Sequence, residues 1–224
     1  MDQLIESEMT FGPYLPGDGF RVEDSAPHKA AGDGVKIIEF YKLYRREGKP
    51  TQLWLVEAKT TAPKSSPQGA QKFVAAMKDG GKKVSPPAIE NLEQHADWFG
   101  EHWPRLFPFM PGDFTVSDFS IYFNELKEKM ENGLRLFYAT RMGRHPYQAD
   151  HWPETFRNLP LNTTELRLFV VIKRAERPWL PQLNDKLRKV MRPLVGAWGM
   201  GPNSVEVLTE EAARRIGLIT HSYA

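Results

Sequence analysis

A glutamate and a lysine at the end of an apolar run carry the strongest chemical signal in this sequence. Glu57 and Lys59 follow the run Leu53–Val56 directly, and a second acid, Glu39, lies in an earlier β-rich segment. Such a run is typical of a buried strand, where charged side chains are costly unless they have partners. Side chains two positions apart in a strand share a face, so Glu57 and Lys59 are expected on one side. The pattern predicts a polar site at the end of a buried strand.

The segment upstream predicts a partner strand for this site. Residues 35–44 have the composition of a strand, in which Glu39 and Leu43 would share one face. A loop that contains Gly and Pro follows them, which indicates a hairpin. Pairing Leu43 with Leu53 would place Glu39 opposite Glu57, roughly 5 Å away. Two carboxylates this close repel each other unless one is protonated or a cation lies between them. Because divalent cations favour hard oxygen ligands, we expect a metal ion there; a register slip of one residue would remove Glu39 from the site.

These three side chains suit the hydrolysis of a phosphodiester. A Mg²⁺ or Mn²⁺ ion held by Glu39 and Glu57 would lower the pKa of its bound water and neutralise charge on the phosphate. Lys59, on the same face, would orient that water or stabilise the transition state. Carboxylate ligands favour Mg²⁺ or Mn²⁺ over Zn²⁺. The alternative is an ordinary ion pair between Glu57 and Lys59, since Glu-x-Lys is common in strands.

The arrangement resembles the PD-(D/E)xK nuclease superfamily, in which an acid on one strand precedes Glu-x-Lys at the end of the next. The matching residues are Glu39, Glu57 and Lys59, and the resemblance covers roughly residues 20–60. Glu39 stands where Asp is usual, and no Pro precedes it. The resemblance implies a restriction-endonuclease-like fold and a nuclease that acts on DNA.

The resemblance also implies further site residues. In this superfamily the two acids bind Mg²⁺, often together with the carbonyl of the residue between acid and lysine, which is Ala58 here. The lysine contacts the attacking water or the scissile phosphate. A further acid often lies upstream, and Glu23 and Glu8 are the candidates for it.

The remaining segments predict an α/β protein. Apolar periodicity predicts helices and strands as follows: helices over residues 71–77, 89–106, 118–142 and 178–195, a terminal helix capped by Thr209, and strands over 20–23, 165–172 and 205–208. The last strand–helix–strand unit implies a right-handed crossover between parallel strands. The predicted fold class is therefore α/β, with a mixed central sheet formed by an antiparallel hairpin unit and a parallel strand pair, flanked by helices. We expect one domain over residues 1–224, with an insertion at about 60–164. Lys129 is expected on a solvated helix face.

Composition narrows the chemistry and the compartment. The chain has no cysteine, which excludes disulfides and thiolate metal sites and fits a cytoplasmic protein. Its net charge of +2 does not by itself require a polyanionic partner. No stretch reaches the length needed to span a membrane, and the acidic N-terminus does not resemble a signal peptide.

Three functions are compatible with these patterns. The first is a metal-dependent nuclease, with DNA favoured over RNA by the resemblance alone, and with lysines of residues 60–88 and the basic face of 178–195 contacting phosphates. The second is a catalytically silent nucleic-acid-binding or assembly subunit, which would present exposed aromatic residues to a protein partner or a second copy. The third is a hydrolase of small nucleotides.

Overall fold

The computed structural model describes residues 2–32, 34–62, 116–144, 151–175 and 177–219. The helices predicted over 71–77 and 89–106 lie outside these residues, as does most of the segment 60–88. The chain divides into two compact units, Met1–Thr61 with Phe123–Ala224, and Ala62–Tyr122. Every strand described below belongs to the first unit. The predicted insertion stays a prediction, although the part from Phe123 onward belongs to the unit that contains the sheet.

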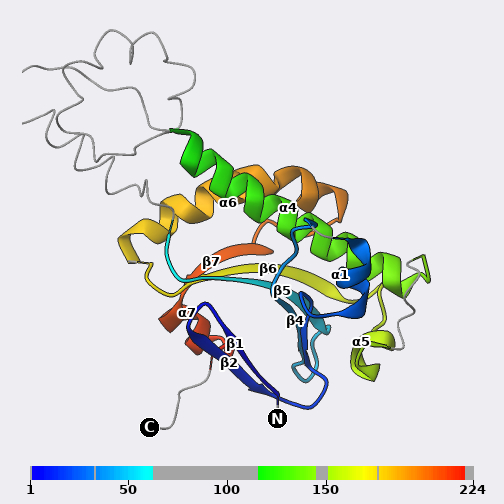
Figure 1. Cartoon of the computed structure of the whole chain (residues 1–224). Helices are drawn as coiled ribbons and strands as arrows, with labels where there is room; N and C mark the ends of the chain where they lie inside the picture. The colour runs from blue at the N-terminus through cyan, green and yellow to red at the C-terminus, as the bar shows by residue number, and fades with distance from the viewer. Residues whose placement is uncertain (1, 33, 63–115, 145–150, 176, 220–224) are drawn as a thin grey trace, which may run out of the picture. The chain divides into compact units, whose positions relative to one another are not determined.

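A mixed five-stranded sheet forms the centre of the first unit (Figure 1). Its strands, in spatial order, are β3 (Gly19–Arg21), β4 (Phe40–Tyr44), β5 (Gln52–Lys59), β6 (Glu165–Ile172) and β7 (Val205–Thr209). β3, β4 and β5 are antiparallel neighbours, whereas β5, β6 and β7 run parallel. Parallel strands covered on both faces are apolar almost throughout, which explains the runs in β5 and β6. The α/β class with a mixed sheet flanked by helices is confirmed.

Helices and a second hairpin cover the two faces of this sheet. The elements are β1 (Asp2–Glu6), β2 (Met9–Tyr14), α1 (Ala26–Ala31), α4 (Val116–Arg141), α5 (Glu154–Arg157), the 3₁₀ helix η4 (Arg177–Trp179), α6 (Leu180–Ala197) and α7 (Glu210–Arg215). Figure 1 shows α4 and α6 over one face, with the β1–β2 hairpin and α7 on the other. The α7 helix begins as predicted, because the Thr209 hydroxyl accepts a hydrogen bond from the backbone N–H of Ala212.

Two apolar layers hold these elements together. On the hairpin side, Phe11 packs edge-on against Phe40, and Trp54 against Phe169. On the α4 side, the Tyr41 ring packs against Phe137, and its hydroxyl donates a 2.7 Å hydrogen bond to a backbone carbonyl of α4. Side chains on β5 alternate between the two layers, and the side chain of Glu57 points into the layer on the α4 side.

The hairpin of β4 and β5 has the predicted register. Leu43 pairs with Leu53, and the last pair is Phe40 with Val56, so one further step along the same register brings Glu39 level with Glu57. The predicted strand over 35–44 was too long, because β4 begins only at Phe40.

The segment before β4 leaves the sheet to contact α4. The carbonyl of Lys36 accepts a hydrogen bond from Asn132 on that helix. Ile38 packs over Gly133, where an added Cβ would lie 3.1 Å from the isoleucine side chain. The glycine therefore allows α4 to approach β4 and β5 closely, one helical turn beyond Lys129.

Candidate active site

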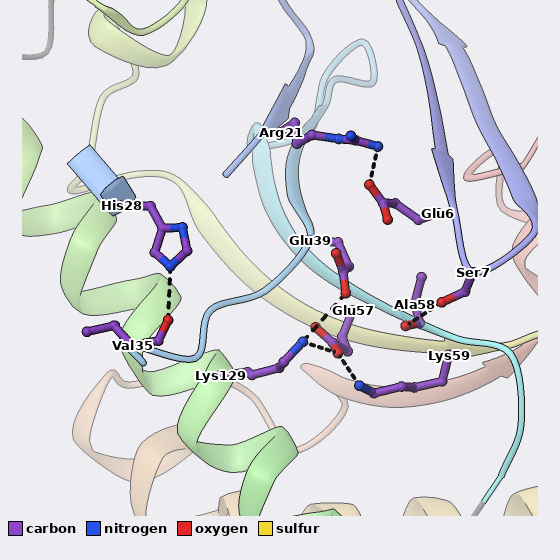
Figure 2. A network of polar contacts seen from close by, with 10 residues as sticks. All are labelled: Glu6, Ser7, Arg21, His28, Val35, Glu39, Glu57, Ala58, Lys59 and Lys129. Atoms are coloured by element: carbon purple, nitrogen blue, oxygen red, sulfur yellow. Dashed lines mark hydrogen bonds and ion pairs between the residues drawn. The ribbon is translucent and has the colours of Figure 1, made fainter. Parts of the chain in front are cut away.

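Glu57 is the buried centre of the site (Figure 2). Its side chain has 0% exposure, although it carries a carboxylate on a strand whose neighbouring positions are apolar. Its Oε1 atom lies 2.7 Å from the ammonium of Lys129 and 2.9 Å from that of Lys59. Its Oε2 atom has no hydrogen-bond partner among the described residues. Two ammonium groups thus compensate the charge at one oxygen, and the other oxygen keeps unused capacity to accept.

Lys129 lies between the two acids, and the sequence analysis did not identify it as a site residue. Its ammonium is 2.7 Å from Glu57 Oε1 and 3.5 Å from Glu39 Oε1, and its side chain is largely buried. Burial alone would lower the pKa of Lys129, but the carboxylates of Glu57 and Glu39 outweigh this and raise it. The prediction of a solvated face was wrong at this position. The only available signal was that Lys129 lies three residues after the buried Leu126 and therefore borders the apolar stripe.

Glu39 completes the cluster and titrates at an unusual pH. Burial, followed by the negative charge of Glu57, raises the pKa of Glu39 to about 7, although Lys129 acts in the opposite direction. These surroundings therefore favour the protonated form of Glu39 more than water does. The predicted proximity of Glu39, Glu57 and Lys59 is present, and Figure 2 shows all three around the ammonium of Lys129 or beside it.

Two further acids influence this cluster: Glu6, which the sequence analysis did not single out, and Glu23, which it did. Glu6, which was missed, pairs with Arg21, and burial still raises its pKa, with Glu57 among the charges that add to the effect. Glu23 is exposed, and its charge contributes to the raised pKa of Glu39. Glu8 instead pairs with Lys173 at 3.1 Å and with Arg174 at 3.3 Å.

The tip of the β1–β2 hairpin reaches the end of β5. The hydroxyl of Ser7 donates a 3.0 Å hydrogen bond to the carbonyl of Ala58, the backbone oxygen that the resemblance assigns to the metal. Ser7 and Glu8 form the turn with φ values of 48° and 60°. Non-glycine residues adopt this left-handed region at a cost, so contacts such as the Ser7–Ala58 hydrogen bond must hold the turn in place.

The charges of the cluster partly fit a divalent cation. Three features indicate that the site would accept more positive charge. It contains two carboxylates, one of their oxygens is buried without a hydrogen-bond partner among the described residues, and burial raises the pKa of Glu39. Against this, the described residues contain no group of three or more His, Cys, Asp or Glu side chains able to hold a metal ion. The Lys129 ammonium also lies where a cation bridging Glu39 and Glu57 would lie. A metal ion therefore fits only if Lys129 withdraws.

Comparisons with family models, curated proteins and solved structures find no match. The chemistry of this site therefore depends on its own geometry. In the described part of the chain, no helix is both long enough and apolar enough to cross a membrane.

Proposed function

We propose that this protein is a metal-dependent phosphodiesterase that cuts nucleic acid, with DNA as the favoured substrate. The observation that carries the proposal is the buried Glu57, held beside Glu39 and contacted by Lys59 and Lys129 at the carboxyl end of β5. A fully buried carboxylate with one oxygen lacking a partner is costly in a purely structural role. The mixed sheet with the hairpin at its centre is compatible with a restriction-endonuclease-like fold. We propose a cytoplasmic location because the chain contains no cysteine.

Each side chain has a role in this proposal. Glu39 and Glu57 would hold Mg²⁺ or Mn²⁺, which supplies a bound water of lowered pKa and positive charge for the phosphate. Lys59, 2.9 Å from Glu57, is placed to orient the water or to stabilise negative charge on the phosphate oxygens. Lys129 neutralises the acids when no metal is bound. Its flexible stem would allow its point charge to move toward the phosphate.

A second candidate function is a silent nucleic-acid-binding or assembly subunit. The observation that favours it is again Lys129, because the ammonium already compensates the carboxylates without any metal. In that case the cluster would only fix α4 onto the sheet.

An assay with Mn²⁺ separates the two candidates. Wild-type protein should cut plasmid, linear duplex or single-stranded DNA, and Glu57→Gln, which removes the charge but keeps the shape, should not. RNA and dinucleotides in the same assay test substrate class, and preferential release from dinucleotides would indicate a small-nucleotide hydrolase. Intact substrates throughout, with folded wild-type protein, would favour the silent subunit.

A further inference from the structure

A second site, lined by basic side chains, lies along β7, from Thr209 at the carboxyl end of the strand to Val205 at its amino end. A cavity of about 600 Å³ opens there, and three arginines from three different elements line it. Arg177 comes from η4, Arg188 from α6 and Arg215 from α7. We name this cavity, with these three residues, the arginine groove. Convergence of three elements on one cavity distinguishes it from an ordinary charged helix face.

At Thr209, the arginine groove reaches the same end of the parallel strands as the candidate active site. Lys59 pairs with Ile172, and Ile172 pairs with Thr209, which also lines the groove. The carboxyl ends of β5, β6 and β7 are therefore level, as Figure 1 shows. Neighbouring strands are about 4.8 Å apart, so the backbones at Lys59 and Thr209 are separated by about 10 Å.

The groove carries an excess of positive charge. Its one acidic lining residue, Asp185, pairs with Lys189 at 3.0 Å, and Glu211 pairs with Arg177 at 2.5 Å. Among the described residues that line the groove, three guanidinium groups thus stand beside one carboxylate, that of Asp185. Arg188 is also fixed in place, because its Nε donates a 3.2 Å hydrogen bond to the carbonyl of Val205. Planar guanidinium groups held in this way suit the oxygens of a phosphate.

We propose that the arginine groove binds the phosphate backbone of a nucleic-acid strand whose scissile phosphate lies at Glu57 and Lys59. The proposal rests on the function proposed above for that site. Because the groove continues from Thr209 along β7 toward Val205, one strand would have to extend from Lys59 past Thr209 to contact both sites. The groove would thereby set the minimum length of substrate and hold the strand in register for cleavage.

Binding without cleavage tests the groove directly. Fluorescence anisotropy with a labelled single-stranded DNA of twelve nucleotides, in EDTA, should show about tenfold weaker binding for Arg188→Ala and for Arg215→Ala, the loss expected for one charge-assisted hydrogen bond. The slope of log affinity against log salt should fall by about 0.7 for each lost phosphate contact. Arg188→Lys should keep most of that slope. Arg46→Ala, in the exposed loop between β4 and β5 and outside both the groove lining and the basic face of α6, is the matched control and should bind as wild type does.

The outcomes keep this proposal distinct from the nuclease proposal. If wild-type protein does not bind DNA, or if the Arg188 and Arg215 variants bind as Arg46→Ala does, the groove proposal is wrong, whether or not Mn²⁺-dependent cleavage is observed. If binding falls as expected but wild-type protein cuts nothing with Mn²⁺, the assignment of phosphate binding to the groove stands, whereas the nuclease proposal and the placement of a scissile phosphate at Glu57 and Lys59 fail. Polyglutamate that displaces DNA at equal charge concentration would overturn the phosphate assignment in favour of an acidic protein segment.

Discussion

At the scale of single residues, the site is an unusual balance of buried charge. Glu57 has no exposure, and Lys129 and Glu39 are largely buried beside it. A buried ion pair is weak evidence of a stabilising role, because desolvation of the charges can exceed their attraction. Removing one partner is nevertheless strongly destabilising, because the other charge is then left buried. This asymmetry makes the lysines informative positions for substitution.

Lys129→Met should separate a structural role from metal competition. Without metal, the free energy of unfolding should fall by about 2–3 kcal/mol, less than the usual 3–5 kcal/mol for breaking a buried pair because Lys59 still contacts Glu57. With the competing ammonium gone, Mn²⁺ should bind about tenfold more tightly than to wild type. Urea unfolding and calorimetric titration measure the two effects.

Lys127→Met is the matched control for this substitution. Lys127 lies on the same helix, and its one ion pair with a described residue is the 3.6 Å contact with Glu131 near the surface. Its loss should change stability by no more than about 0.5 kcal/mol and leave Mn²⁺ affinity unchanged. Equal Mn²⁺ affinity in wild type and Lys129→Met would show that the ammonium does not occupy the metal position.

Lys59→Ala should impair turnover more than metal binding. If Lys59 acts on the water or the phosphate, its removal should lower the cleavage rate about a hundredfold, as loss of one transition-state donor does. Mn²⁺ should bind as well as to wild type or better, because a nearby positive charge has gone. A cleavage assay and a metal titration on the same preparation test this. A variant that cuts at the wild-type rate would reduce Lys59 to an ion-pair partner of Glu57.

Glu39 should make stability depend on pH in a defined window. The pKa of Glu39 rises from 4.5 to about 7 on folding, because of burial and then the charge of Glu57. Between these values the folded state binds more protons than the unfolded state, so this group makes the protein less stable as pH rises from about 4.5 to 7, with no further change above that.

Glu39→Gln removes this titration and tests its sign. The variant should lose less stability than wild type between pH 5 and pH 7 in urea unfolding. Glu128→Gln, at an exposed pair with Lys36 on the same side of the molecule, should follow the wild-type profile. Parallel wild-type and Glu39→Gln profiles would mean that Glu39 is already ionised at pH 5.

At the scale of elements, the sequence predicted the strands and helices that carry long apolar runs or stripes. The strands β5 and β6 and the helices α4 and α6 were expected within a few residues, because burial imposes their periods on the sequence. The hairpin register followed from the same alternation and brought Glu39 to Glu57.

Elements that depend on tertiary contacts were not predicted. The β1–β2 hairpin was missed because its turn, Ser7 and Glu8, lacks the Asn or Gly that usually marks positive φ. Lys129 was missed because a lysine beside an apolar stripe looks the same in sequence whether it faces water or a buried carboxylate. Only the close approach of α4 at Gly133 decides between the two.

Gly133→Ala and Gly196→Ala form a matched pair that tests this approach. Both glycines lie in helices, where alanine is favoured by about 1 kcal/mol. Gly196 has open space around it, so its substitution should stabilise the protein by up to that amount. At Gly133 the new methyl group would lie 3.1 Å from Ile38 and 3.4 Å from Leu55, and this crowding should cancel or reverse the gain. Equal stabilisation by both substitutions in urea unfolding would show that α4 is free to shift away from the sheet.

At the scale of the whole molecule, the parallel strands bring distant parts of the chain to one edge. Lys59, Ile172 and Thr209 are aligned by register although they lie far apart in sequence. Active sites in open α/β sheets form at the carboxyl ends of strands, where the candidate site lies and which the arginine groove reaches at Thr209. Because the fold holds the candidate site together, metal binding there should be detectable as a change in the thermal stability of the protein.

Mn²⁺ should raise the melting temperature of the wild-type protein. A ligand that binds only the folded state adds about 2.7 kcal/mol at a hundred times its Kd. For a domain of this size, that free energy corresponds to a shift on the order of 5–10 °C. Glu57→Gln should abolish the shift, because it removes the central carboxylate charge, whereas Glu8→Gln should keep it, because Glu8 pairs with Lys173 and Arg174 instead. Circular dichroism melts with Mn²⁺ and with EDTA measure the difference. A shift that survives in Glu57→Gln would place the metal elsewhere, and no shift in wild-type protein at millimolar Mn²⁺ would favour Lys129 as the permanent cation of this site.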